Sequence, residues 1–345
     1  MHSMKRTRRD LGRAAAAFIT AAAFVAYAHA AARADADKIK LGVGTGGVGH
    51  LAIAQEQGYF AAENLTVEFV HFEAAEPIAV AVAAGSVDFG ATGLSGALYS
   101  LGAQGLIKII AGSISEVPGF QFLTVVVSNQ AYAAGWTQFK DLAGHSVAVP
   151  QIGSPSHYSL ALIAEKYHVD LAGVRVLPVQ SVPNSISAAT GGQADAAIIP
   201  IPSVTPSLQR SDVKLMGFVG DETPWQVQAV FTTGKIANER HDLVERFLRA
   251  YRKGAQDMHD TFTGPDGKRQ DGEAADKMFA IIAKYTGQSA AQAKLAISYV
   301  DREGRLDVKD VLHQIAWYKQ QNMLKGAVEG DMVIDKRYVT ALPER

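Results

Sequence analysis

Two short stretches of this chain of 345 residues repeat one pattern, and the repetition decides the fold. Residues 81–93 read AVAAGSVDFGATG, and residues 188–200 read AATGGQADAAIIP. In each stretch an aspartate follows a glycine by three residues: Gly85 and Asp88 in the first, Gly192 and Asp195 in the second. Glycine commonly ends a helix, and the apolar residues after the aspartate predict a buried strand. The chain therefore builds the same helix-to-strand corner twice.

The sequence around both corners alternates predicted strands with predicted helices. Apolar and alternating runs predict strands at 38–43, 65–72, 87–91 and 107–112, and again at 123–128, 145–150, 174–179, 194–199, 214–218 and 229–233. Because parallel strands need crossover helices on both faces, this alternation predicts an α/β fold with two mostly parallel sheets flanked by helices. From residue 238 onward the pattern predicts helices almost throughout, including 289–300.

Length and composition narrow the class of protein. The chain is long enough for two domains, and 48% hydrophobic with 19% charged residues is typical of a globular protein with a large core. The balance of charges shows no basic excess, so we expect no nucleic-acid partner. The chain has no cysteine, which excludes disulfides, thiol chemistry and a cysteine-linked lipid anchor.

The first 34 residues have the three-part layout of a signal peptide. A cationic start, 5–13, precedes an Ala-rich apolar segment, 14–28, and small-x-small cleavage sites follow at 28–30 and 32–34. The pair Arg8-Arg9 resembles a twin-arginine export signal, but an ordinary Sec signal rich in arginine has the same layout. We therefore expect a mature protein exported to the periplasm, with the export route left open.

Beyond these patterns, the chain resembles the substrate-binding proteins of ABC importers, in the nitrate/sulfonate/taurine and thiamine-precursor group. The matching segments are 39–69, 78–93, 139–154, 188–200 and 334–342. The resemblance implies a two-lobe, type II periplasmic-binding-protein (Venus flytrap) fold. Its first lobe would hold residues 38–122 plus 227–345 and its second lobe residues 123–226, with strands near 123–128 and 226–233 crossing between them.

The resemblance also implies a function. The protein would capture a small organic molecule, expected to be an anion such as a sulfonate or carboxylate, and would deliver it to an inner-membrane permease. Such a protein is not an enzyme, needs no cofactor and acts as a monomer. The ten histidines show no zinc-ligand spacing, so we expect no metal.

Candidate ligand-binding residues lie where predicted strands end, because ligands of open α/β sheets bind outside the carboxyl ends of the strands. Glycines permit close approach of the backbone, and hydroxyls and free N–H groups at helix starts bind oxygen atoms. The candidates are Gly46, Gly47, His50, Thr92, Gly93, Ser95, Ser154, Ser156, His157, Tyr158, Pro200 and Gln226. Three have an alternative structural role: Ser95 as a helix cap, and His157 and Tyr158 as packing residues.

The candidate loops contain no Lys or Arg. An anion would therefore be held by neutral donors, or the ligand is not strongly anionic.

A different class of function also matches the first loop. Gly44-x-Gly46-x-x-Gly49 follows a predicted strand and precedes a predicted helix, as in a dinucleotide-binding fingerprint. Glu68 and Glu73 lie near the distance at which such folds place an acid that binds ribose. An exported NAD(P)-binding oxidoreductase is the alternative. We prefer the binding protein because no catalytic set accompanies the glycines.

Overall fold

The computed structural model describes residues 36–44 and 46–343. The predicted signal peptide, residues 1–34, lies outside the described residues. Contacts divide the chain into Met1–Asp37 and one compact unit, Lys38–Arg345, which carries the fold. None of the described helices combines the length and the apolar character that crossing a bilayer requires.

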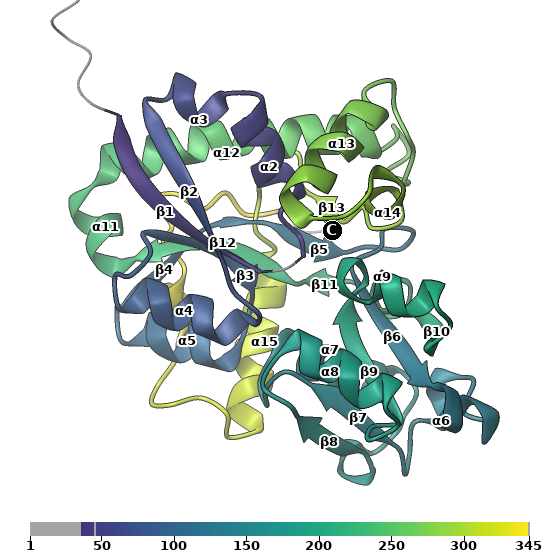
Figure 1. Ribbon diagram of the computed structural model, residues 1–345. Coiled ribbons are helices and arrows are strands. Elements are labelled where there is room, and N and C mark those ends of the chain that lie inside the picture. The colour runs from purple at the N-terminus through teal and green to yellow at the C-terminus, as the bar shows by residue number, and fades with distance from the viewer. Residues whose placement is uncertain (1–35, 45, 344–345) are drawn as a thin grey trace, which may run out of the picture. The chain divides into compact units, whose positions relative to one another are not determined.

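The first sheet has five strands in the order β2-β1-β3-β12-β4 (Figure 1). Its strands are β1 (Asp37–Val43), β2 (Leu65–His71), β3 (Phe89–Gly93), β4 (Ile107–Gly112) and β12 (Gln228–Thr233). β1 and β3 are parallel, whereas β12 is antiparallel to both β3 and β4. A strand from late in the sequence thus lies between two early ones.

Helices cover both faces of the first sheet, and we call this sheet with its helices the first lobe. One face carries α2 (Gly49–Glu56), α3 (Tyr59–Ala62) and α12 (His241–Phe262), and the other carries α4 (Ala75–Ala83) and α5 (Gly96–Ala103) (Figure 1). Side chains alternate between the two faces along β12, so Val230 packs in one core cluster and Phe231 in the other. Phe89 stacks on Phe247 of α12, with ring centroids 4.2 Å apart.

The second sheet has the order β10-β6-β9-β7-β8 and, with its helices, forms the second lobe. Its strands are β6 (Leu123–Ser128), β7 (Ser146–Val149), β8 (Arg175–Pro178), β9 (Ala196–Pro200) and β10 (Val213–Phe218), and its helices are α6 (Asn129–Ala133), α7 (Pro155–Lys166), α8 (Val182–Thr190), α9 (Ile201–Gln209) and α10 (Val219–Glu222). β7 is parallel to β8 and β9, but β6 is antiparallel to β9 and β10. The predicted α/β class with two flanked sheets is confirmed, and the pairing refines it, because both sheets are mixed.

The two repeated corners have one structural role. Gly85 and Gly192 adopt positive φ angles of 71° and 73° after α4 and α8. Asp88 Oδ2 then accepts the Lys40 N–H at 2.7 Å, and Asp195 Oδ2 accepts the Ser146 N–H at 2.8 Å. In each lobe the carboxylate therefore ties the start of one parallel strand to its neighbour.

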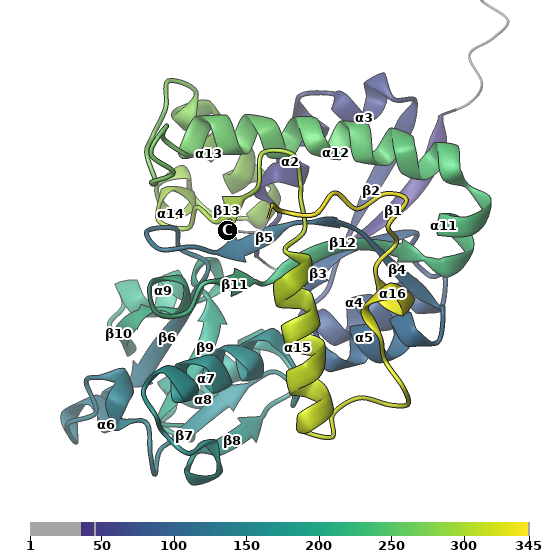
Figure 2. The same ribbon diagram turned by 180° about the vertical axis from the view of Figure 1, so that it is seen from behind.

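Short strands join the lobes. β5 (Ile114–Glu116) pairs with β11 (Trp225–Gln226) and with β13 (Tyr299–Val300) in a third, antiparallel sheet (Figure 2). The crossing strands expected near 123–128 and 226–233 correspond to β6 and β12, which lie inside the two main sheets. β5 lies in the segment that follows β4 of the first sheet, and β11 lies in the segment that follows β10 and α10 of the second, so these two strands lie where the chain passes between the sheets.

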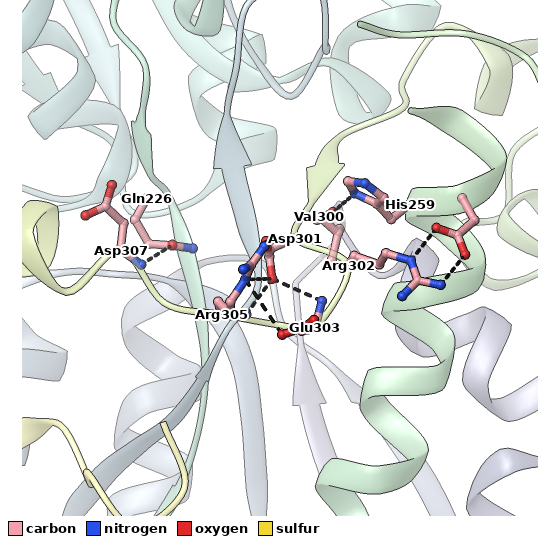
Figure 3. Close-up of polar contacts among 9 residues, drawn as sticks. Gln226, His259, Val300, Asp301, Arg302, Glu303, Arg305 and Asp307 are labelled. Carbon is pink, nitrogen blue, oxygen red and sulfur yellow. Dashed lines mark hydrogen bonds and ion pairs between the residues drawn. The ribbon is translucent and has the colours of Figure 1, made fainter. Parts of the chain in front are cut away.

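The C-terminal part is largely helical, as predicted, except at residues 289–300. Its helices are α11 (Gly234–Glu239), α12, α13 (Ala275–Thr286), α14 (Ala290–Lys294), α15 (Val308–Gln320) and α16 (Gly330–Val333). The helix expected over 289–300 is only the five residues of α14, because Tyr299 and Val300 pair with β5. Near this point the buried Asp301 forms a two-pronged ion pair with Arg305, and Gln226 Oε1 accepts the Asp307 N–H at 3.1 Å (Figure 3).

The corner aspartate of the second lobe offers a test of this account. Asp195 Oδ2 accepts from both the N–H and the hydroxyl of Ser146, which is buried. Burial alone would raise the pKa of Asp195, but the hydrogen bonds from Ser146 and the nearby His145 lower it below its usual value. The ionised carboxylate therefore stabilises the fold at neutral pH, and this contribution is lost as the pH falls below about 4. We expect Asp195→Ala to reduce the free energy of unfolding by about 1–2 kcal/mol at neutral pH in urea denaturation.

Asp88→Ala is the matched control. Its single bond to Lys40 is exposed, so water replaces it and the loss should be smaller. No loss for Asp195→Ala, or a larger loss for Asp88→Ala than for Asp195→Ala, would contradict the role given to the corner.

Candidate functional site

A cavity lies between the two lobes, at the ends of their strands. Its volume is about 70 Å³, which exceeds what one water molecule needs. Its polar lining side chains are Glu73, Thr92, Gln151, Ser154, Ser156 and Gln228, and its larger apolar ones are Phe72, Phe122, Leu123, Pro150, Pro155, Val182, Pro200 and Val227. Such a lining, apolar with a few placed polar groups, is typical of a small-molecule site.

Half of the predicted site residues meet in this cavity: Gly46, Thr92, Gly93, Ser154, Ser156 and Pro200. Thr92 lies at the end of β3 in the first lobe, and Ser154 lies just before α7 in the second. Two strand exits far apart in the sequence thus line one cavity.

Helix starts surround the cavity. Ser154 caps α7, its Oγ accepting the His157 N–H at 3.3 Å, and Pro155 occupies the first turn. Ala75 begins α4 and Val182 begins α8, and both line the cavity. The partial positive charge at a helix start favours acceptor or anionic groups of a ligand.

The lobes touch closely beside the cavity. A Cβ on Gly93 would lie 2.2 Å from Pro155 Cγ, and one on Gly46 would lie 3.2 Å from Pro200 Cβ. Two backbone hydrogen bonds also cross between the lobes: Gly96 N–H donates to Gly153 O at 3.1 Å, and Val182 N–H donates to Glu73 O at 3.2 Å. Glycine is therefore required at Gly93 by close approach of the second lobe.

Three predicted site residues are in the core instead. His50 is fully buried, with Nε2 3.1 Å from Ser113 Oγ, and burial lowers its pKa to about 3. His157 Nδ1 accepts the Gly153 N–H at 3.1 Å, and burial lowers its pKa to about 4. The Tyr158 hydroxyl is 2.9 Å from His313 Nδ1, and its ring packs against Trp225. These side chains are buried in contacts that stabilise the loops, and they do not line the cavity.

Gly47, Ser95 and Gln226 also lie outside the cavity. Gly47 has a φ angle of +79° and packs against Ile114. Ser95 Oγ accepts the Leu98 N–H at 3.2 Å, so it caps α5. Gln226 belongs to the connection between the lobes, where its Nε2 donates to Gln228 O at 2.7 Å.

Sequence reasoning did not assign Glu73, Gln151 and Gln228 to this cavity. Gln151 follows β7 and Glu73 follows β2. The expectation that ligands bind outside the carboxyl ends of strands could therefore have identified both residues. From the sequence, Glu73 is a candidate only for the acid that binds the ribose of a dinucleotide. Gln228 is the first residue of β12 and lies two positions after Gln226, which the sequence predicted as a site residue.

The glycine-rich loop does not leave room for a dinucleotide. Gly46 lies against Pro200, and Gly47 against Ile114 and Gln228. The adjoining cavity is also small. Gly46 is therefore explained by close packing against the second lobe, which favours the binding interpretation over the oxidoreductase.

Comparison with known proteins agrees with this geometry. The family model described as NMT1/THI5 like matches residues 48–261, well over half of the chain. The chain belongs to the NMT1/THI5-like family. The predicted family resemblance is thereby confirmed. No match was found among curated proteins.

Solved structures share the fold of this family member at low sequence identity. The alkanesulfonate-binding protein SsuA from Xanthomonas axonopodis pv. citri, bound to MOPS, is 17% identical with a TM-score of 0.68, covering 87% of this chain and 99% of its own. The periplasmic nitrate-binding protein NrtA from Synechocystis PCC 6803 is 11% identical with a TM-score of 0.66, covering 88% and 87%. The desulfurization enzyme DSZB is 15% identical with a TM-score of 0.62, covering 88% and 96%. The two-lobe periplasmic-binding-protein fold is therefore confirmed.

Gly93 provides a test of the contact between the lobes. The three atoms nearest to a Cβ at this position all belong to Pro155, so the clash of Gly93→Ala is entirely between lobes. We expect the variant to fold but to hold the lobes apart, which small-angle X-ray scattering would detect as a larger radius of gyration.

The second substitution Pro155→Ala should reverse part of this expansion, because it removes the clashing Cγ. An unchanged radius of gyration for Gly93→Ala would show that the lobes do not meet here in solution.

Proposed function

We propose that this protein is the solute-binding component of an ABC-type import system. It captures a small organic molecule between its lobes and delivers it to a permease of the inner membrane. Membership of the family and the periplasmic-binding-protein fold support this proposal. The observation that carries it is the shared cavity of Thr92 and Ser154, which come from different lobes.

The cavity can hold an acidic head without a cationic side chain. None of the described residues that line it is Lys or Arg. The hydroxyls of Thr92, Ser154 and Ser156 and the starts of α4, α7 and α8 are the groups suited to oxygen atoms. We therefore propose that an acidic head, such as a carboxylate or sulfonate, lies toward Thr92 and Ser154.

Binding without chemistry accounts best for the lining. Glu73 is the only ionisable side chain among the described residues of the cavity. General acid–base catalysis needs a positioned proton donor or acceptor of suitable pKa, and the nearby His50 and His157 are buried in other contacts. DSZB shows that an enzyme can have this fold, so absence of turnover must be measured.

Capture would proceed by closure of the lobes. We place the first lobe at residues 38–122 plus 227–345 and the second at 123–226. A ligand that contacts both lobes stabilises the closed form by its differential affinity for it. The monomeric protein would then act in the periplasm after removal of residues 1–34, and its closed form would dock to the permease.

The experiment is a ligand screen on the mature protein. Native mass spectrometry would detect a retained solute, and thermal shift would compare sulfonates, carboxylates, aromatic acids and pyrimidines. A ligand at 100 times its Kd should stabilise the protein by about 2.7 kcal/mol. Binding of NADH, with energy transfer from tryptophan and no response to any solute, would instead support the oxidoreductase.

Hydroxyl removal tests the site directly. Thr92→Val keeps the shape of the side chain but removes a hydroxyl that faces the ligand, so affinity should fall about 5–10-fold in calorimetry. Ser95→Ala is the control, because Ser95 caps α5 outside the cavity. It should lower stability by about 1 kcal/mol and leave affinity unchanged. A larger affinity loss for Ser95→Ala than for Thr92→Val would refute this placement of the ligand.

A further inference from the structure

A side-chain hydrogen bond joins the two lobes at the start of α9. Gln288, which lies between α13 and α14, donates from Nε2 to the Pro202 carbonyl of α9 at 2.6 Å. Beside this bond α14 packs against α9, well away from α4 and α5 (Figure 1). Neither Gln288 nor Pro202 lines the cavity between the lobes. The bond is therefore a contact between lobes that lies outside the candidate site.

The sequence of α9 explains why the Pro202 carbonyl needs a donor from outside the helix. In an α-helix this carbonyl would accept the N–H of the residue four positions later, which here is Pro206. Proline has no N–H, so that hydrogen bond cannot form. Pro202 is buried, and a buried carbonyl without a donor destabilises the conformation that buries it. The amide of Gln288 supplies the donor that Pro206 cannot.

The corner between α13 and α14 holds Gln288 on the first lobe. Gly287 ends α13 with a φ angle of +68°, and the Gln288 N–H donates to Ala283 O at 3.1 Å. Ser289 then caps α14, its Oγ accepting the Gln292 N–H at 3.2 Å. α13 packs against α2 of the first lobe. The backbone of Gln288 therefore moves with the first lobe, whereas Pro202 moves with the second.

Only one orientation of the Gln288 amide suits this place. With Nε2 toward Pro202 a donor meets the carbonyl, whereas the reversed amide would set two acceptors against each other. Gln288 Oε1 is buried and has no hydrogen-bond partner among the described residues. Gln288 also lines a cavity of about 20 Å³, which has room for one water molecule that can donate to Oε1. The contact with α9 thus depends on the donor of this side chain.

Resting on the proposed function, we propose that Gln288 is a positioning residue for closure of the lobes. When the lobes part, water reaches the Pro202 carbonyl and the Gln288 amide. When the lobes close, these two groups satisfy each other, so part of the protein is closed before a solute binds. Because a solute held between the lobes binds the closed form more tightly, a larger closed population raises its affinity without any contact with Gln288.

The test measures the distance between lobes in mature protein freed of solute by unfolding in urea and refolding. Spin labels at Val80→Cys on α4 and Ser187→Cys on α8 report this distance by double electron–electron resonance. Gln288→Met removes the donor at nearly constant length. We expect it to raise the ratio of open to closed protein about 5-fold, which is the effect of losing one hydrogen bond.

Gln57→Met is the matched control. Gln57 Oε1 accepts the Lys277 Nζ of α13 at 2.9 Å, so this substitution removes a glutamine contact of α13 within the first lobe. The ratio of open to closed protein should not change.

Pro206→Ala tests the reason for the contact. Alanine restores an N–H that can reach the Pro202 carbonyl inside α9, so the carbonyl has a donor whether the lobes are open or closed. In this background Gln288→Met should change the ratio less than about 2-fold, because the two substitutions act on the same carbonyl.

The outcomes distinguish the two proposals. An unchanged distance distribution for Gln288→Met overturns the inference, and so does an undiminished effect in the Pro206→Ala background. Urea denaturation of each variant measures folding separately, and a loss of stability without a change in distance would show that the bond serves the fold alone. None of these results involves a solute, so they leave the proposed function standing, which fails if the ligand screen finds no bound solute.

Discussion

The approach of Gly93 to Pro155 is the contact on which the rest of the site depends. It brings the end of β3 against the start of α7, and the Gly96–Gly153 hydrogen bond lies beside it. Without this approach, Thr92 and Ser154 would face solvent on separate lobes. The cavity and the helix starts around it form one site only because the two sheets end opposite each other.

The sequence predicted the architecture well because the decisive signals are local. Gly85 and Gly192 end helices, and Asp88 and Asp195 precede buried strands, so each corner could be recognised from a few residues. The mixed pairing could not, because the positions of β6 and β12 depend on where the chain crosses between lobes. Likewise, Tyr299 and Val300 form a strand only because β5 is available to pair with them.

The sequence predicted which loops form the candidate site, but not which side chains of those loops face the cavity. Thr92, Gly93, Ser154 and Ser156 line the cavity, because strand exits and helix starts mark them in the sequence. Their neighbours His50 and Tyr158 do not, since a residue in the same loop or helix turn can point into the core. Which side chain faces the cavity is decided by tertiary packing, and so Gln228 could be assigned to the lining only in three dimensions.

The most direct measurement is the distance between lobes with and without solute. Because the chain lacks cysteine, spin labels can be placed at Val80→Cys on α4 and Ser187→Cys on α8, both of which are exposed. Double electron–electron resonance should show a broad distance distribution in the stripped protein and a shorter, narrower one when the retained or best-binding solute is added. A distribution unchanged at saturating solute would contradict capture by closure of the two lobes.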